Sequence, residues 1–576
     1  MSMGKKRNAN NESIVANRRS VKIEENYDLG RAIDYRAYQI DFTKLHFDAY
    51  CVKYGKPSGL KAMDTYRRCL EYDMRKAMLD DDVPKAWLKK DICRGAIEHI
   101  ICQAFCFSNI IMNPIQPDNS IVVAVYDKKE KIYRPVDKVK EVFGAIKGLT
   151  YSSLSERQCE DIYNCAARMS KEIPVRCNPH EIPCRNYLWD EITNKKIPYG
   201  EDVVLMSRGN VDYNPYASNP HIHNDDDGTD WDVDSWLLEI FDGDEELVDL
   251  FWQIAARIVR PYRKSHGIVL FSGTGHNGKG TLLELLRNLV GVGAWADVGM
   301  AEFEERFGLS ALIDSQVVLR DENKMNFQFG GADRLKSAAS CDVFEIERKN
   351  EKEKISIVFP GLIVECVNEL PRVKDKTDAW YQRLIPVPFT KVFMQNERGY
   401  IKDDYLSRTE VLEYVKRRAI ETEIREIRDT KLPKRSYELL EYYKVVNDPI
   451  RSFWQDISGD LVWDVIPRDF IYDLYVAWFS RFNKSGHAAG RNTFYDTFKG
   501  LIDNDPNWIA RFGKNDRVFP PSLPMPCEPL ISKYNLTFWY NPNYKGTNTS
   551  QRCTGAPVTA SGFKGIVRIN FSNNIK

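Results

Sequence analysis

The chain has 576 residues, of which 43% are hydrophobic and 12% aromatic, enough for about three domains with cores of their own. Its 82 basic residues balance 82 acidic ones, so any binding of nucleic acid must rest on local patches rather than on overall charge. The sequence contains no apolar run of membrane-spanning length and no signal peptide, so we expect no membrane partner. Thirteen scattered cysteines are typical of reduced thiols and indicate a cytoplasmic protein.

The first third of the chain divides into three segments. Residues 1–28 are polar and basic, which predicts a disordered basic arm, more simply a solvated tail than a nucleic-acid contact. Residues 29–172 are expected to form a helical N-terminal domain, because apolar residues recur at helical spacing. Residues 173–261 begin with prolines between short predicted strands such as 203–206, and helical periodicity returns over 236–258.

Two groups of metal-ligand residue types occur in this region. His221 and His223 precede a stretch rich in aspartate, which we interpret as a solvated loop and helix start rather than a metal site. Cys177, His180 and Cys184 contain no Cys-x-x-Cys pair, so a zinc site is not predicted either.

The most informative segment is a glycine-rich turn between an apolar run, 267–271, and a helix-like run, 282–286. A strand, a glycine-rich turn and a helix in this order form a phosphate-binding loop, in which backbone N–H groups and a lysine bind the phosphates of a nucleotide such as ATP. The lysine is Lys279. The residues expected to bind the nucleotide are Gly273, Thr274, Gly275, His276, Asn277, Gly278, Lys279, Gly280 and Thr281.

One position of this loop departs from the usual pattern. A serine or threonine that ligates Mg²⁺ normally follows the lysine, but here Gly280 stands at that place and Thr281 comes one residue later. Thr281 therefore either supplies the hydroxyl ligand or leaves the metal to other groups.

Two further predicted strand ends and an arginine after them offer polar residues suited to ATP hydrolysis. The run 315–320 ends at Asp321 and Glu322, where one carboxylate can hold Mg²⁺ and the other can polarise the attacking water. The run 361–367 ends at Asn368, which can reach the γ-phosphate or that water. Arg383 is a candidate arginine finger for the ATP of a neighbouring subunit, although it can equally pair with a local acid.

These motifs, in this order and spacing, resemble the superfamily 3 helicases, above all the helicase half of phage and plasmid primase-helicases and of the poxvirus primase-helicase. Gly-Lys-Gly-Thr is a common variant in that family, so the resemblance implies that Gly280 does not abolish activity. It also implies an α/β, AAA+-like P-loop ATPase core over residues 262–400. ATP and Mg²⁺ would be the cofactors, and a homo-oligomeric ring, a hexamer by likeness, would move along single-stranded DNA.

Residues 333–349 are similar to the family's third motif, which leads into a β-hairpin that grips DNA. Alternation over 343–347 predicts such a hairpin across 344–357. The candidate DNA-binding residues are Lys336, Arg348, Lys349 and Lys352. Glutamates lie among them, so a solvated charged hairpin is the alternative.

The resemblance extends to both sides of the core. Residues 186–216 look like the family's pre-helicase segment, so 173–261 is expected to be this segment with collar-like helices. Residues 401–436 read as a charged helical connector. Residues 437–518 are expected to form a winged-helix-like domain, because 446–454 and 472–482 resemble the family there. Residues 519–576 are a C-terminal extension with a proline-rich start and strand-like runs at 536–540 and 565–569.

The sequence therefore predicts an ATP-dependent, ring-forming DNA helicase for phage or mobile-element replication, located in the host bacterial cytoplasm if phage-encoded. Its partners would be single-stranded and forked DNA and other replication proteins. Residues 30–170 show no metal-carboxylate pattern, so no primase activity is predicted. One alternative is an ATP-switched loader that binds origin duplex DNA without processive unwinding. A second alternative is an AAA+ remodeller of proteins, against which the charged channel segment argues.

Overall fold

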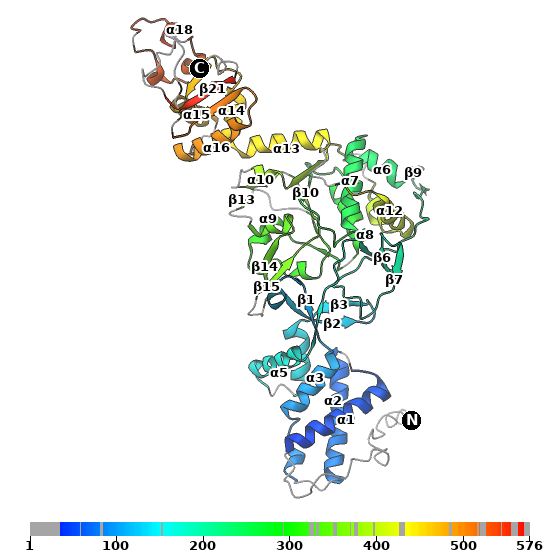
Figure 1. Ribbon diagram of the computed structural model, residues 1–576. Helices are drawn as coiled ribbons and strands as arrows, with labels where there is room; N and C mark the ends of the chain where they lie inside the picture. The colour runs from blue at the N-terminus through cyan, green and yellow to red at the C-terminus, as the bar shows by residue number, and fades with distance from the viewer. Residues whose placement is uncertain are drawn as a thin grey trace, which may run out of the picture. The chain divides into compact units, whose positions relative to one another are not determined.

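The computed structural model describes most of residues 35–569. It leaves undescribed residues 1–34, 58, 81–84, 151–153, 292, 322–327, 330–332, 350–353, 369, 374–377, 395–397, 426–431, 483–486, 515, 517, 519–525, 543, 554–562 and 570–576. The chain divides into two compact units (Figure 1). The first comprises residues 1–327, 331–369 and 383–433, and the second comprises residues 328–330, 370–382 and 434–576. Within the described part, no helix has the length and apolar character needed to cross a membrane.

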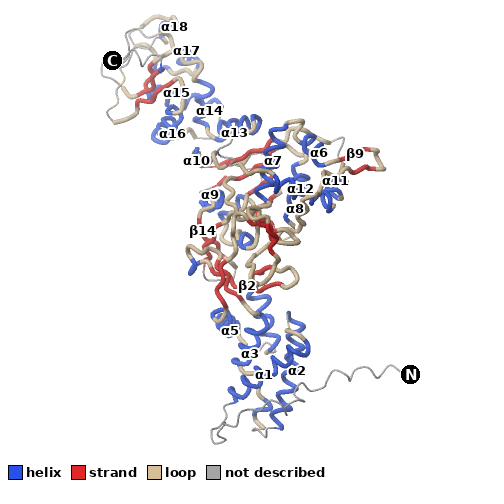
Figure 2. The backbone as a smooth tube through the Cα atoms, turned by 45° about the vertical axis from the view of Figure 1, so that its right-hand side comes forward, coloured by secondary structure: helices blue, strands red, loops and turns tan. Residues whose placement is uncertain are grey.

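The first unit begins with helices, as the apolar periodicity predicts. These are α1 (Tyr35–Tyr54), α2 (Gly59–Asp80), α3 (Arg94–Phe105), α4 (Gly144–Leu149) and α5 (Glu156–Arg168). Helices α1, α2 and α3 lie side by side (Figure 2) around a shared apolar core. Ile97, Ile100 and Ile101, which set the helical period of α3, are all buried in it.

A four-stranded sheet, which the sequence patterns did not predict, also forms here beside the expected helices. Its order is β3-β2-β1-β4, with bounds β1 (Ser108–Ile111), β2 (Ile121–Asp127), β3 (Ile132–Pro135) and β4 (Lys171–Pro174). Strand β1 pairs parallel with β4, more than fifty residues further along the chain. Strands this short are held by pairing with distant residues, and the helical patterns on either side leave no separate signal for them in the sequence.

The next segment has two small antiparallel elements and two helices. Strands β5 (Glu181–Pro183), β6 (Leu188–Asp190) and β7 (Lys195–Ile197) form one sheet, and β8 (Ile222–Asn224) pairs with β9 (Thr229–Trp231). Helices α6 (Val233–Ile240) and α7 (Glu245–Ile258) follow. Residues 203–206 are buried but form no strand, because their backbone makes isolated hydrogen bonds, such as Arg176 N–H to the Val204 carbonyl, instead of a ladder. The predicted strand there is wrong.

The aspartates before these helices have a structural role. The Asp232 carboxylate accepts from the Ser235 N–H, and the Asp244 carboxylate accepts from the Leu247 N–H, at 3.0 and 3.1 Å. Both residues are N-caps, which satisfy helix N–H groups and favour the positive end of the helix dipole. The described residues contain no group of three or more His, Cys, Asp or Glu side chains placed to hold a metal.

A five-stranded parallel sheet in the order β11-β12-β16-β10-β18 forms the centre of the first unit. The strands are β10 (Ile268–Ser272), β11 (Trp295–Ala296), β12 (Val317–Arg320), β16 (Ile363–Val367) and β18 (Leu384–Pro388). They are almost entirely buried, as expected for parallel strands covered on both faces. The strands predicted at 267–271, 315–320 and 361–367 are therefore confirmed.

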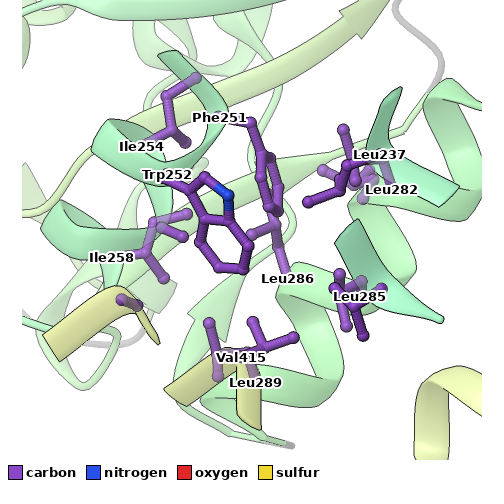
Figure 3. Close-up of a cluster of buried hydrophobic side chains, with 14 of the residues drawn as sticks. Leu237, Phe251, Trp252, Ile254, Ile258, Leu282, Leu285, Leu286, Leu289 and Val415 are labelled. Atoms are coloured by element: carbon purple, nitrogen blue, oxygen red, sulfur yellow. The ribbon is translucent and has the colours of Figure 1, made fainter. Parts of the chain in front are cut away.

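Helices α8 (Lys279–Val290) and α12 (Thr409–Glu421) pack with α7 next to this sheet. Figure 3 shows Phe251 and Trp252 of α7 against Leu282 and Leu286 of α8, with Val415 of α12 nearby. Buried aromatic and leucine side chains of this kind dominate the stability of a core. The unit also contains α9 (Asp333–Ala339), α11 (Gly399–Asp403) and a hairpin of β14 (Val343–Glu347) and β15 (Lys354–Val358).

The second unit is helical with a small sheet. Its helices are α10 (Asp378–Tyr381), α13 (Lys434–Asn447), α14 (Pro449–Ile457), α15 (Arg468–Phe482), α16 (Arg491–Asp503), α17 (Pro529–Lys533) and α18 (Thr549–Arg552). Strands β19 (Val465–Pro467), β20 (Trp508–Arg511) and β21 (Gly565–Arg568) form an antiparallel sheet in the order β19-β21-β20, and β13 (Gln328–Phe329) pairs with β17 (Arg372–Val373).

Sequence patterns predicted a few of these elements. Helices over 471–482 and 493–502 and a strand over 565–569 are confirmed by α15, α16 and β21. The strand predicted over 536–540 is wrong, because Thr537–Trp539 is a 3₁₀ turn. Its aromatic Trp539 packs on Phe470 and donates to Asp473 at 3.0 Å, so a turn, not a strand, places this half-buried side chain.

Candidate nucleotide site

Three neighbouring strands of the parallel sheet end at one cavity. The loop 273–278 follows β10, Asn368 follows β16, and Asp321 follows β12. Residues 274–278 of this loop, Asn368 and Asp321 line a cavity of about 460 Å³ together with Lys279, Gly280 and Thr281. The carboxyl edge of a parallel sheet is where ligands bind in α/β proteins, and the sequence-predicted residues meet there.

The loop takes a shape that needs glycine. Gly275 and Gly278 have φ of +112° and +84°, in the region that side chains other than glycine rarely adopt. A Cβ atom at Gly273 would lie 2.1 Å from Nδ2 of Asn277. Gly278 is the N-cap of α8, so the first N–H groups of that helix face the loop, as in an anion-binding helix start.

Lys279 points inward and is 6% exposed. Its Nζ donates to the Gly273 carbonyl at 2.5 Å and to Oδ1 of Asn277 at 3.0 Å, and Asn277 Nδ2 donates to the Phe389 carbonyl at 3.2 Å. Burial lowers the pKa of Lys279, while its electrostatic interactions with Cys366 and Asp321 act in the opposite direction. The loop itself thus holds a desolvated ammonium group ready for an anion.

Asp321 approaches the first turn of α8. A Cβ atom at Gly280 would lie 3.3 Å from Oδ2 of Asp321, so glycine at this position leaves room for the carboxylate. Burial, reinforced by the Asp321 charge and a hydrogen bond to it, raises the pKa of the neighbouring Cys366 thiol. The carboxylate of Asp321 and the hydroxyl of Thr281 are the hard oxygen donors that Mg²⁺ prefers, so the residues fit this ion. Glu322 lies outside the described residues.

Asn368 and Arg383 lie in different places. Asn368 is exposed at the carboxyl end of β16, inside the cavity. Arg383 directly precedes β18 and is not among the residues that line the cavity. It is half-buried, and its Nε donates to Oγ of Ser340 at 3.1 Å. It therefore stands at the amino edge of the sheet, away from the nucleotide cavity of its own chain.

One wall of the cavity consists of charged residues that the sequence did not predict to belong to the site. Glu239 of α6 and Arg398, just before α11, form an ion pair at the cavity, and Lys402 of α11 lies beside them. The His276 carbonyl in the loop accepts from the Phe393 N–H at 2.7 Å. These residues lack any motif and are far from the loop in sequence, so only the tertiary fold brings them to the site.

The predicted hairpin is present, but two of its described cations have protein partners. Lys354 pairs with Glu345 and Glu347 at 3.1 and 3.6 Å. Arg348 is half-buried and donates to the Val136 carbonyl at 3.4 Å, so it does not stand at an open tip.

The other DNA-binding candidates differ in exposure. Lys336 pairs with Asp333 at 3.9 Å, whereas Lys349 is exposed. Lys352 lies outside the described residues. Lys349 is thus the candidate whose surroundings fit a phosphate contact best.

Two separate segments match known families. Residues 271–383 match a family of unknown function, DUF5906, and residues 446–520 match a family described as poxvirus D5 protein-like. Together the two matches cover less than half of the chain. The second match includes residues 446–454 and 472–482, to which the resemblance was extended, and it confirms a poxvirus D5-like segment there. No curated protein matches the chain.

Among solved structures, two forms of the NrS-1 C-terminal region are similar to the chain. An A-form apo structure is 15% identical, covers 70% of this chain and 85% of the other, and has a TM-score of 0.36. An apo structure of residues 305–718 is also 15% identical, covers 72% and 96%, and has a TM-score of 0.39.

Proposed function

We propose that the protein is an ATP-dependent DNA helicase of superfamily 3 that assembles as a ring and moves along single-stranded DNA during phage or mobile-element replication. One observation carries this proposal. Lys279, Asp321 and Asn368 follow three neighbouring parallel strands and line one cavity with a glycine loop at a helix start. A cation, a carboxylate and an amide around such a loop are the groups that nucleotide hydrolysis needs.

The phosphates of ATP would be bound by the loop and Lys279. On binding, the ammonium group exchanges its bonds to Gly273 and Asn277 for phosphate oxygens, and the N–H groups at the start of α8 contribute further donors. Because Lys279 is already desolvated, its charge acts strongly on the phosphates. Asp321 and Thr281 would hold Mg²⁺, which when bound neutralises charge on the phosphate oxygens.

The hydrolytic step would use three further residues. Glu322 would polarise the attacking water as a general base, and Asn368 would contact that water or the γ-phosphate. Arg383 would stabilise transition-state charge in the ATP site of a neighbouring subunit. Its place at the amino edge, away from its own cavity, supports action across a subunit interface, and hence a ring.

Hydrolysis around the ring would move the β14–β15 hairpins along DNA. Within this hairpin, exposed Lys349 is the residue we assign to a backbone phosphate, whereas Lys354 is neutralised by Glu345 and Glu347. Phosphate contacts by lysine bind without reading sequence, which suits a motor that must move over any sequence.

Unwinding of a forked duplex by the full-length protein tests the proposal. The wild type with ATP and Mg²⁺ should separate the strands, and neither Lys279→Ala nor Glu322→Gln should do so. Lys61→Ala, which changes an exposed lysine of α2, serves as the matched control and should unwind normally. A wild type that hydrolyses ATP but never separates the fork contradicts the motor assignment.

The alternative of an origin-binding loader has one structural argument in its favour. The segment that matches the D5-like family contains helices α15 and α16 next to an antiparallel sheet, a compact arrangement that can bind duplex DNA. Protection of the origin of its own replicon in footprinting, without unwinding, would favour the loader over the helicase.

A further inference from the structure

The second unit contains two cysteines, Cys527 and Cys553. Both are free thiols. Cys553 is a buried member of the apolar core of that unit, and half-buried Cys527 packs against the same core. Neither residue belongs to the nucleotide site or to the hairpin assigned to DNA, and the two come together only in the folded chain.

A backbone hydrogen bond holds the two cysteines next to each other. The N–H of Glu528, the residue after Cys527, donates to the Cys553 carbonyl at 3.0 Å. The Cα atom of each cysteine lies two covalent bonds from an atom of this hydrogen bond, so the two Cα atoms are within about 8 Å of each other. The Cα–Cα separation of a disulfide, roughly 4.4–6.8 Å, falls inside this limit.

The two side chains interact directly. Burial raises the pKa of both thiols, and a hydrogen bond between the two side chains lowers the pKa of Cys527 and raises that of Cys553. Because the thiols are already in contact, a covalent bond between the sulfur atoms requires movement of the side chains rather than of the backbone.

Hydrogen bonds on both sides fix the pair in place. Glu528 is fully buried, and its carboxylate accepts from the two backbone N–H groups of residues 462–463 at 2.8 and 3.1 Å. The Cys553 N–H donates to the Thr549 carbonyl at 3.1 Å, at the end of α18. Two groups held in this way react with each other at an effective concentration far above that of free thiols.

We propose that Cys527 and Cys553 form a reversible intrachain disulfide by exchange with a low-molecular-weight disulfide such as glutathione disulfide. Cys527 reacts first, because it is half-buried whereas Cys553 is 1% exposed. The Cys527 thiolate attacks one sulfur of the oxidant, breaks its S–S bond and releases one glutathione thiolate. The Cys553 thiolate then attacks the Cys527 sulfur, closes the intrachain bond and releases the second glutathione.

The reaction balances without a further reagent. The two protein thiols lose two electrons, which reduce the oxidant to two glutathione molecules, and the two thiol protons pass to the released thiolates. In a reducing compartment a disulfide of this kind is transient and follows the redox state of the thiol pool.

The disulfide would fasten α18 to the D5-like segment. Glu528 anchors the start of α17 on residues 462–463, which lie within the D5-like match, and Cys553 follows α18 directly. A covalent link between these points restrains the roughly 25 residues between the two cysteines. The proposal does not depend on ATP hydrolysis or DNA binding.

Peptide mapping by mass spectrometry tests the proposal on the folded full-length protein, equilibrated with glutathione and glutathione disulfide. In the wild type, the link between Cys527 and Cys553 should exceed glutathione on Cys527 by at least about tenfold, because the second step is intramolecular. Cys553→Ser should stop at the mixed disulfide and accumulate glutathione on Cys527. Cys527→Ser should leave Cys553 unmodified, since the oxidant cannot reach a buried thiol.

Cys177, an exposed cysteine of the first unit, is the reference for an accessible single thiol. It should take up glutathione without forming a link, and Cys177→Ser should leave the link between Cys527 and Cys553 unchanged. A thermal midpoint for each reduced variant establishes that it is folded, and the wild-type map needs no variant. Glutathione on Cys527 of the wild type without the link, a link that forms only in denaturant, or an unmodified pair when Cys177 is fully modified would overturn the proposal.

Discussion

The two edges of the parallel sheet carry two different kinds of site. At the carboxyl edge, a glycine loop, a lysine and a carboxylate surround a polar cavity, and Lys279 already has hydrogen-bond partners there. At the amino edge, mainly apolar segments enclose a second cavity, and Nδ2 of Asn113 and Nε2 of Gln316, which belong to two of its wall residues, are buried without an acceptor. Strands β12 and β16 connect the two.

The two sites differ in how much of the chain is needed to form them. The carboxyl-edge site depends on backbone geometry that a short sequence segment encodes, such as the left-handed Gly275 and Gly278. The amino-edge site is assembled from segments far apart in the chain, none of which carries a motif. A site of the first kind is readable from sequence, and one of the second kind requires the fold.

Replacement of Arg383 should have the largest effect, because an arginine that acts across an interface can contribute about a thousandfold to the rate. Arg383→Ala and Lys279→Ala should each be inactive as pure proteins. Mixed in equal amounts, they should regain ATP hydrolysis, since some interfaces then combine an intact Lys279 with an intact Arg383. The steady-state ATPase rate across mixing ratios measures this. A mixture as inactive as its components would mean that Arg383 has no role in the neighbouring site.

Asp321→Asn should lower the apparent affinity for Mg²⁺ by about 10- to 100-fold. The substitution removes the charged oxygen donor while it keeps the shape of the side chain. A Mg²⁺ titration of ATP hydrolysis gives this value. Asp314→Asn is the matched control, since it makes the same change at the amino edge. An equal loss in both variants would contradict the assignment of metal binding to the carboxyl edge.

Gly280→Ala should have a smaller effect. The added Cβ would lie 3.3 Å from Oδ2 of Asp321, so the carboxylate must move by a few tenths of an ångström. We expect a loss of about threefold to tenfold in kcat/KM for ATP, since small displacements of catalytic groups reduce rates. Gly459→Ala, where a Cβ meets no atom within 4 Å, should leave the rate unchanged. A wild-type rate in Gly280→Ala would show that catalysis does not require the close contact between the Asp321 carboxylate and residue 280.

The smallest expected change comes from a pair of buried glutamines, each 5% exposed. Gln253 donates to the Glu423 carbonyl at 2.9 Å and accepts from the Arg425 N–H at 3.0 Å, whereas Nε2 of Gln316 has no partner. Gln253→Leu should lower the free energy of unfolding by about 1–3 kcal/mol, because it leaves buried groups unpaired. Gln316→Leu should be neutral or stabilising. Denaturant unfolding measures both, and equal losses would show that the Gln316 amide is satisfied after all.

Sequence patterns predicted the strands and the loop of the candidate nucleotide site, because a strand, a glycine turn and a helix follow one another within a short segment. The patterns missed the β1–β4 pairing, which joins strands far apart in the chain. They also predicted strands at 203–206 and 536–540 that do not form, because the backbone there makes isolated hydrogen bonds and a turn instead of pairing with another strand. Arg398 and Lys402 were missed because only α11 brings them to the cavity. The roles of all the candidate site residues stay predictions, and Glu322 and Lys352 lie outside the described residues.

The central claim is that a nucleotide site at the carboxyl edge drives movement on DNA, and the rate of ATP hydrolysis with and without single-stranded DNA tests it most directly. We expect DNA to raise the rate of the wild type several times over, and Lys279→Ala to show neither the basal nor the stimulated rate. A wild type that hydrolyses no ATP, or whose rate is indifferent to single-stranded DNA, would contradict the account.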